Sequence, residues 1–180
     1  MANQALFKAF QSVRNHSVEA CESLELEDYS LQAAAFSSPP KWHLAHTSWF
    51  FETFILLKHQ PKYSVVNKHY AVLFNSYYNA IGKQFDRPKR GCLSRPTLEK
   101  VMEYRTIIDT RMMDFINPLP DGDPLLLLIQ LGLNHEQQHQ ELILTDIKHA
   151  LSQNPTFPSF LSHYEHQDRL ASDYHWFEFE

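Results

Sequence analysis

The chain has 180 residues, of which 43% are hydrophobic and 13% aromatic, and its formal net charge is −5. This content of apolar side chains excludes a disordered protein and suffices for one domain with a buried core. The acidic balance argues against a general nucleic-acid-binding protein, and no apolar run approaches the roughly 20 residues that span a bilayer. With only two cysteines, Cys21 and Cys92, and no signal peptide, we expect a cytoplasmic protein that binds neither nucleic acid nor membrane.

The order of periodic segments and prolines predicts an all-α fold. Glycine is scarce, and the ten prolines fall between segments with apolar residues at spacings of three and four, as in long helices joined by loops. The predicted helices cover residues 3–24, 37–59, 94–116 and 125–151, and a long, aromatic-rich loop over 61–94 separates the second from the third. We therefore expect a four-helix bundle over residues 1–154.

The first two predicted helices each have an apolar stripe. In the first helix the stripe includes Cys21, which we expect in the core, whereas Arg14 lies off it. Ser37-Ser38-Pro39-Pro40 predicts a serine-capped start of the second helix. There, His46 shares a face with tryptophans, so it is either a core histidine with a hydrogen-bond partner or a metal ligand; His43, one turn earlier, is the competing candidate.

Three arginines in the middle of the chain could form ion pairs. Arg87 and Arg90, in the run Arg87-Pro88-Lys89-Arg90, could bind a carboxylate through two hydrogen bonds each, or the run could be a solvated basic loop. Arg105 falls inside the apolar stripe of the third helix. An arginine on an inward face predicts a paired carboxylate or a water-filled cavity.

The fourth predicted helix contains His135 and His139. A spacing of four residues turns by about 40° and rises by about 6 Å, so both imidazoles leave one face of the helix and could hold one metal ion. Leu128, Leu131 and Leu142 have helical spacing with this pair, so we expect the histidines to point inward.

The run from His135 to His139 also matches the His-Glu-x-x-His signature of zinc proteases, with Glu136 as general base. The longer protease signature is absent, since Leu142 and Thr145 occupy its positions, and we disfavour this interpretation. A helix bundle would instead complete the site from a facing helix, where His46 is the candidate third ligand. Three neutral imidazoles suit zinc, iron(II), nickel or copper.

Residues 155–180 form an aromatic and polar tail that ends in Trp176-Phe177-Glu178-Phe179-Glu180. This ending alternates as the beginning of a strand does. A strand at that point has no predicted partner earlier in the chain. We therefore expect the tail to lead toward a further domain that the 180 residues do not include.

Four motifs together closely resemble the N-terminal domain of the ergothioneine-pathway sulfoxide synthases (hercynine oxygenases), which belongs to the DinB-like helical-bundle superfamily. The motifs occur in the order Pro40-Lys41-Trp42-His43-Leu44-Ala45-His46-Thr47, Leu73-Phe74-Asn75-Ser76-Tyr77-Tyr78, Arg87-Pro88-Lys89-Arg90-Gly91 and His135-Glu136-Gln137-Gln138-His139-Gln140-Glu141-Leu142. The resemblance covers about residues 30 to 160.

This resemblance implies a non-haem iron(II) ion held by His46, His135 and His139. In the family, the metal activates O2 to join a cysteine-type thiol, such as cysteine or γ-glutamylcysteine, to the imidazole ring of hercynine as a sulfoxide. The resemblance places Gln138 near the imidazole substrate and assigns Arg87 and Arg90 to the carboxylate of the thiol substrate. It makes His43 a residue that supports the site or packs in the core.

The chain departs from the family in one respect. Family members continue into a C-terminal domain similar to the formylglycine-generating enzyme, which supplies a catalytic tyrosine and part of the pocket. We therefore expect the 180 residues to form little or no C–S bond alone. Two alternatives remain open: a stand-alone DinB-like thiol transferase or hydrolase that uses zinc or nickel, and a non-catalytic metal-binding bundle.

Overall fold

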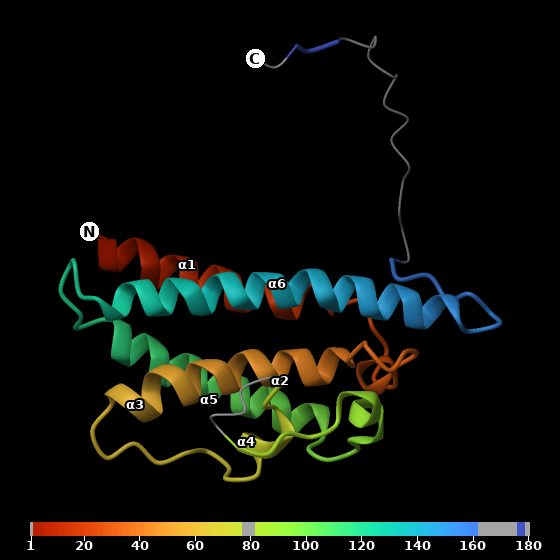
Figure 1. Ribbon diagram of the computed structural model, residues 1–180, viewed down its shortest axis with the longest axis horizontal. Coiled ribbons are helices and arrows are strands. Elements are labelled where there is room, and N and C mark those ends of the chain that lie inside the picture. The colour runs from red at the N-terminus through yellow and green to blue at the C-terminus, as the bar shows by residue number, and fades with distance from the viewer. Residues whose placement is uncertain (1, 77–81, 162–175, 179–180) are drawn as a thin grey trace.

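Four long helices build the domain in the computed structural model, which describes residues 2–76, 82–161 and 176–178 (Figure 1). They are α1 (Ala2–Glu19), α2 (Pro40–Phe51), α5 (Leu98–Ile116) and α6 (Leu125–Ser152). Helix α2 packs against α5 and α6, and α1 packs against the same two helices, so the four close around one core. The described residues contain no strand, and the predicted all-α fold is confirmed.

The second helix is longer than α2 alone. It continues through a π-helical turn, Glu52–Leu56, and a last α-helical turn, α3 (Leu57–His59), before Pro61. Every residue of α2 is buried, because loops and helices surround it on all sides. The predicted serine cap is wrong: Pro39 is the N-cap and makes no side-chain hydrogen bond to the helix. The Ser38 hydroxyl instead accepts a hydrogen bond from Arg90.

The first helix ends at Glu19, five residues before the predicted end. Residues 20–24 continue in tighter turns, in which the amide of Cys21 donates to the carbonyl of Val18 and the amide of Leu24 to that of Cys21. Cys21 is fully buried and Leu24 packs against the core, so the apolar pattern outlasts the helix. The apolar pattern thus marks side chains that contact the core, and it extends beyond the helical backbone.

The segment between the second and third long helices packs onto the bundle. Its described residues form two short helices, α4 (Tyr70–Leu73) and the 3-10 helix η4 (Arg87–Cys92). Another 3-10 helix, η1 (Asp28–Ser30), precedes α2. The indole of Trp42 donates to the carbonyl of Leu73, and the ammonium of Lys41 donates to that of Leu93. The predicted loop is thus an ordered cover over α2. Residues 77–81 lie outside the described part.

Helices α2 and α6 approach closely at Gly132. A Cβ atom there would lie 2.6 Å from Cε1 of Phe51, which is shorter than a van der Waals contact. Only glycine therefore permits this approach. Because His135 lies one turn further along α6, the contact brings it to the side of α2 that carries His46.

Beyond α6 the described chain is short and irregular. Phe160 packs against the end of α6, and residues 176–178 form no regular structure. The rest of the predicted tail and of its strand-like ending lies outside the described residues. Within the described part, no helix combines the length and the apolar character needed to cross a membrane.

Candidate metal centre

Three histidines from two helices meet in the structure. His46 comes from α2, and His135 and His139 come from α6, with one ring nitrogen of each lying within 4.8 Å of the others. The Nε2 atoms of His46 and His135 are 3.2 Å apart. Two ligands at a metal–nitrogen distance of about 2.0–2.1 Å are separated by about 2.9 Å at a right angle and about 3.3 Å at a tetrahedral angle. The spacing fits two ligands of one ion.

Helix α6 is rotated from the predicted orientation. Leu131 is 57% exposed and Leu142 is 38% exposed, so the prediction that both face inward with the histidines is wrong. The buried face is formed by Ile129, Leu133, Glu136, Gln140 and Ile143. His139 is buried and His135 is half-buried, at the boundary between core and surface. The boundary position leaves one side of the cluster open to ligands.

His46 is fixed by its ring neighbours and by one hydrogen bond. Its imidazole stacks between the indoles of Trp42 and Trp49, at centroid distances of 4.5 and 5.5 Å. Its Nδ1 lies 2.6 Å from the carbonyl oxygen of Phe74, which can only accept, so Nδ1 carries the proton. The Nε2 atom that faces His135 is then the one with a free lone pair.

His43 stands behind His139 rather than in the cluster. Its Nδ1 lies 2.8 Å from Nδ1 of His139, and its Nε2 lies 3.2 Å from Oδ2 of Asp146. The residue pattern left His43 as a competing ligand, whereas the family resemblance made it a residue that supports the site or packs in the core; Asp146 was not predicted. A signal was present, since Asp146 follows His139 by seven residues, or two helical turns, and so shares its side of α6.

The four imidazoles are neutral near neutral pH. Burial lowers the pKa of His43, and burial together with the neighbouring His135 holds the pKa of His46 well below its usual value. Burial lowers the pKa of His135 to about 4 and, with the adjacent histidines, that of His139 still further. Neutral imidazole is the form that binds a metal, so the cluster is suited to a cation.

The cluster opens into a cavity of about 420 Å³. Besides the three histidines, the cavity is lined by Ser76, Arg87, Gln138 and Leu142. The structure thus brings Arg87 and Gln138, two of the predicted substrate-binding residues, to the same cavity as the three histidines. Ser76 was not predicted for this role, although it lies in a motif that carried the family resemblance.

Arg90 does not line this cavity. Its side chain is buried, with the guanidinium carbon 3.4 Å from the ring centroid of Trp42, and it donates a hydrogen bond to Ser38. Since Trp42 also stacks on His46, Arg90 supports the position of the His46 ring through Trp42. Its predicted contact with a substrate carboxylate stays a prediction.

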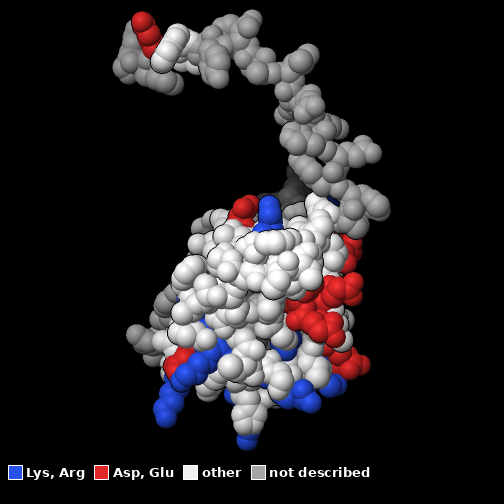
Figure 2. Space-filling model, turned by 90° about the vertical axis from the view of Figure 1, so that its right-hand side faces the viewer, with Lys and Arg blue, Asp and Glu red and all other residues white. Residues whose placement is uncertain are grey.

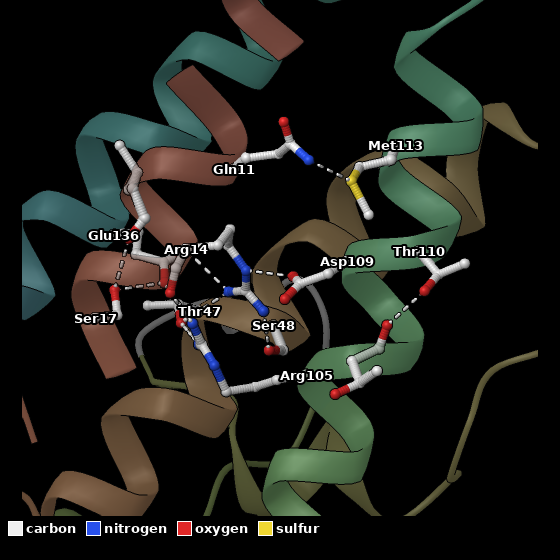
Figure 3. A network of polar contacts seen from close by, with 12 residues as sticks. Gln11, Arg14, Ser17, Thr47, Ser48, Arg105, Asp109, Thr110, Met113 and Glu136 are labelled. Carbon is white, nitrogen blue, oxygen red and sulfur yellow. Dashed lines mark hydrogen bonds and ion pairs between the residues drawn. The ribbon is translucent and has the colours of Figure 1, made fainter. Parts of the chain in front are cut away.

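Glu136 points into a buried polar network formed with residues of α1 and α5 (Figure 3). Its carboxylate accepts hydrogen bonds from Arg14, Arg105 and Ser17, and it is fully buried. The two guanidinium groups outweigh the effect of burial and lower the pKa of Glu136. An ionised carboxylate held by two arginines is a poor general base, which weakens the zinc-protease interpretation further.

The same network settles two sequence predictions. The expected carboxylate partner of Arg105 is Glu136, at 3.1 Å. The placement of Arg14 off the buried stripe is wrong, because its guanidinium is buried between Glu136 and Asp109. The partners lie on α1, α5 and α6, so no local pattern in the sequence could reveal the pairing (Figure 3).

Charge is unevenly distributed over the end of the bundle at which α6 ends, which Figure 2 views face-on. Figure 2 shows acidic side chains gathered on one side and basic side chains along the lower edge. Exposed acidic residues, including Glu22, Glu25 and Glu27, follow α1, whereas exposed Lys89 and Arg95 lie in the segment before α5. That segment also supplies Arg87 to the cavity.

A comparison with protein families agrees with this architecture. No curated protein matches the chain. A profile of the DinB superfamily matches residues 9–143, a span that includes all three clustered histidines and most of each long helix. The chain therefore belongs to the DinB superfamily.

Proposed function

We propose that this chain binds one iron(II) ion through His46, His135 and His139 and serves as the metal-binding domain of an O2-dependent sulfoxide synthase. The observation that carries the proposal is the cavity into which the three neutral imidazoles open together with Arg87 and Gln138. The resemblance of four sequence motifs to the hercynine oxygenases supports iron as the metal and a thiol and an imidazole as the substrates.

Bound iron(II) would supply the O2 chemistry of a four-electron oxidation, in which an imidazole C–H and a thiol S–H are replaced by a C–S(=O) group and water. The residues of the chain would bind and orient the two substrates. The Arg87 guanidinium can pair with a substrate carboxylate, and the Gln138 amide can donate to or accept from an imidazole. Both line one cavity, which would bring the two reacting groups together.

A second candidate, a thiol transferase that uses zinc or nickel, is favoured over a hydrolase by the composition of the cavity. Its described lining contains no carboxylate, since the polar groups besides the histidines are Ser76, Arg87 and Gln138. A metal-bound thiolate is itself a nucleophile, whereas hydrolysis at a metal usually needs a neighbouring general base. Three imidazoles alone do not choose between these metals and iron.

The test is anaerobic loading of the purified chain with iron(II), followed by nitric oxide and electron paramagnetic resonance. For the synthase we expect an iron–nitrosyl signal that changes when cysteine or γ-glutamylcysteine is added, and changes less in Arg87→Gln. Tight zinc or nickel binding with turnover of a thiol conjugate would instead establish the transferase. Metal that binds without any response to thiols would indicate a non-catalytic bundle and overturn both.

A further inference from the structure

A chain of hydrogen bonds runs from Asp146 through His43 to His139. Oδ2 of Asp146 accepts the backbone N–H of Ser38 at 2.8 Å and lies 3.2 Å from Nε2 of His43. Nδ1 of His43 in turn lies 2.8 Å from Nδ1 of His139. The side chains of His43 and Asp146 are 3% and 13% exposed, so water competes little for these bonds.

The direction of each hydrogen bond follows from the groups at its ends. A carboxylate only accepts, so the proton of neutral His43 is on Nε2 and its Nδ1 has a lone pair. The bond between the two histidines must then be donated by Nδ1–H of His139. This leaves the Nε2 atom of neutral His139 with a lone pair, which is the form that a metal ion requires.

We propose that His43 and Asp146 are positioning residues that hold His139 in its metal-binding tautomer and orientation. The inference rests on the proposed metal site but concerns residues that do not contact the metal. Three elements take part: the segment before α2 supplies Ser38, α2 supplies His43, and α6 supplies Asp146 and His139. Asp146 therefore also ties the two helices together at the metal site.

The three candidate ligands differ in how firmly their tautomers are set. His46 is set by the carbonyl of Phe74, and His139 by His43. The buried Nδ1 of His135 has no hydrogen-bond partner among the described residues, although its ring stacks on Phe50 at 4.5 Å. Loss of the Asp146–His43 chain should thus change the tautomer of His139 and leave that of His46 unchanged.

The contact with Ser38 supplies a conservative control. Because the Ser38 N–H and His43 both point at the same oxygen of Asp146, an asparagine would turn its carbonyl oxygen, not its NH2 group, toward them. Asp146→Asn should therefore keep the hydrogen bonds from Asp146 through His43 to His139, and the tautomers of both histidines, although its carbonyl is a weaker acceptor than the carboxylate. Asp146→Leu removes the acceptor, and His43→Phe removes the middle of the chain while keeping a ring against Trp42.

The experiment is long-range 1H–15N correlation of the metal-free protein labelled with 15N-histidine, at pH 7.5. In the wild type we expect protons on Nδ1 of His139 and Nδ1 of His46, and on Nε2 of His43. In His43→Phe and Asp146→Leu, His139 should shift toward the Nε2–H tautomer while His46 keeps its signal. Asp146→Asn should resemble the wild type.

Zinc and cobalt(II) titrations of the same proteins give the second measurement. We expect affinity to fall about tenfold to hundredfold in His43→Phe and Asp146→Leu, the usual effect of losing a partner of a metal-binding histidine. Circular dichroism and the His46 signal show whether a variant is folded; if His43→Phe is not, Asp146→Leu decides the question.

Two results would overturn the positioning role: a proton on Nε2 of His139 in the metal-free wild type, or unchanged tautomer and metal affinity in both disruptive variants. A wild type that binds neither zinc nor cobalt would contradict the proposed metal site. The tautomers measured without metal would still decide whether the hydrogen-bond chain exists, so the two failures are distinguishable.

Discussion

Replacing Glu136 by glutamine should destabilise the protein without removing a catalytic group. The carboxylate accepts from Arg14 at 2.9 Å, Arg105 at 3.1 Å and Ser17 at 2.7 Å, and no part of it reaches solvent. Two arginines face two carboxylates in this cluster, Glu136 and Asp109, so the substitution leaves one buried positive charge without its counterpart. Breaking such a buried pair costs about 3–5 kcal/mol.

The measurement is urea unfolding of wild type and Glu136→Gln, followed by far-ultraviolet circular dichroism at neutral pH. We expect the midpoint to fall with little change in slope, and metal stoichiometry to persist where the variant is folded. Glu141→Gln is the matched control, because Glu141 is exposed on the same helix and its loss should change stability by less than about 0.5 kcal/mol. Unchanged stability with lost turnover or lost metal would refute this reasoning and give Glu136 a chemical role.

Three further predictions follow from the geometry of the centre. Gly132→Ala should lower the free energy of unfolding by up to about 2 kcal/mol, because overpacking against Phe51 outweighs the gain in helix propensity. It should also weaken zinc binding in titrations, and an unchanged zinc affinity would refute the argument that Gly132 sets the approach of α2 and α6. The pKa of His135 falls from 6.5 in the unfolded chain to about 4 in the folded protein, so the unfolded chain takes up the proton first. His135 alone should therefore lower the stability of the metal-free protein in urea by up to about 1.4 kcal/mol per pH unit as the pH falls from about 6.5 to 4, and His43, His46 and His139 should add to this slope; a stability that does not change with pH in this range would contradict the burial of the histidines. Arg87→Gln should weaken the affinity of the metal-loaded protein for a carboxylate-bearing thiol by about tenfold to hundredfold, as measured by calorimetry. Lys89 is exposed and outside the cavity, so Lys89→Gln should leave this affinity unchanged; equal effects of the two substitutions would exclude Arg87 as the anion site.

The helices were predictable because their signals are local. Apolar spacing and prolines placed the fourth helix at residues 125–151, against the observed Leu125–Ser152. The same reasoning failed at residues 20–24, where Cys21 is buried and partly buried Leu24 packs against the core after the helix has ended. It also failed for Ser37-Ser38, because a serine before a proline resembles a cap whether or not its hydroxyl bonds the helix.

The candidate site was predictable where residue type and helical period were sufficient. His135 and His139 follow from their spacing. The position of His46 among tryptophans left it open as a core histidine or a ligand, and the family resemblance made it the third ligand. The rotation of α6 was not predictable, because Leu131 and Leu142 satisfy a helical pattern equally well on an exposed face. It depends on contacts distant in sequence, above all the pairing of Glu136 with arginines of α1 and α5.

The central claim is tested most directly by the metal content of the purified chain and of its single histidine variants, measured by elemental analysis. We predict one metal ion per chain in the wild type and its loss in His46→Ala, His135→Ala and His139→Ala. His149→Ala, exposed further along the same helix, should keep the full amount. A wild type without metal, or a His46→Ala variant that retains one ion per chain, would contradict the three-histidine centre.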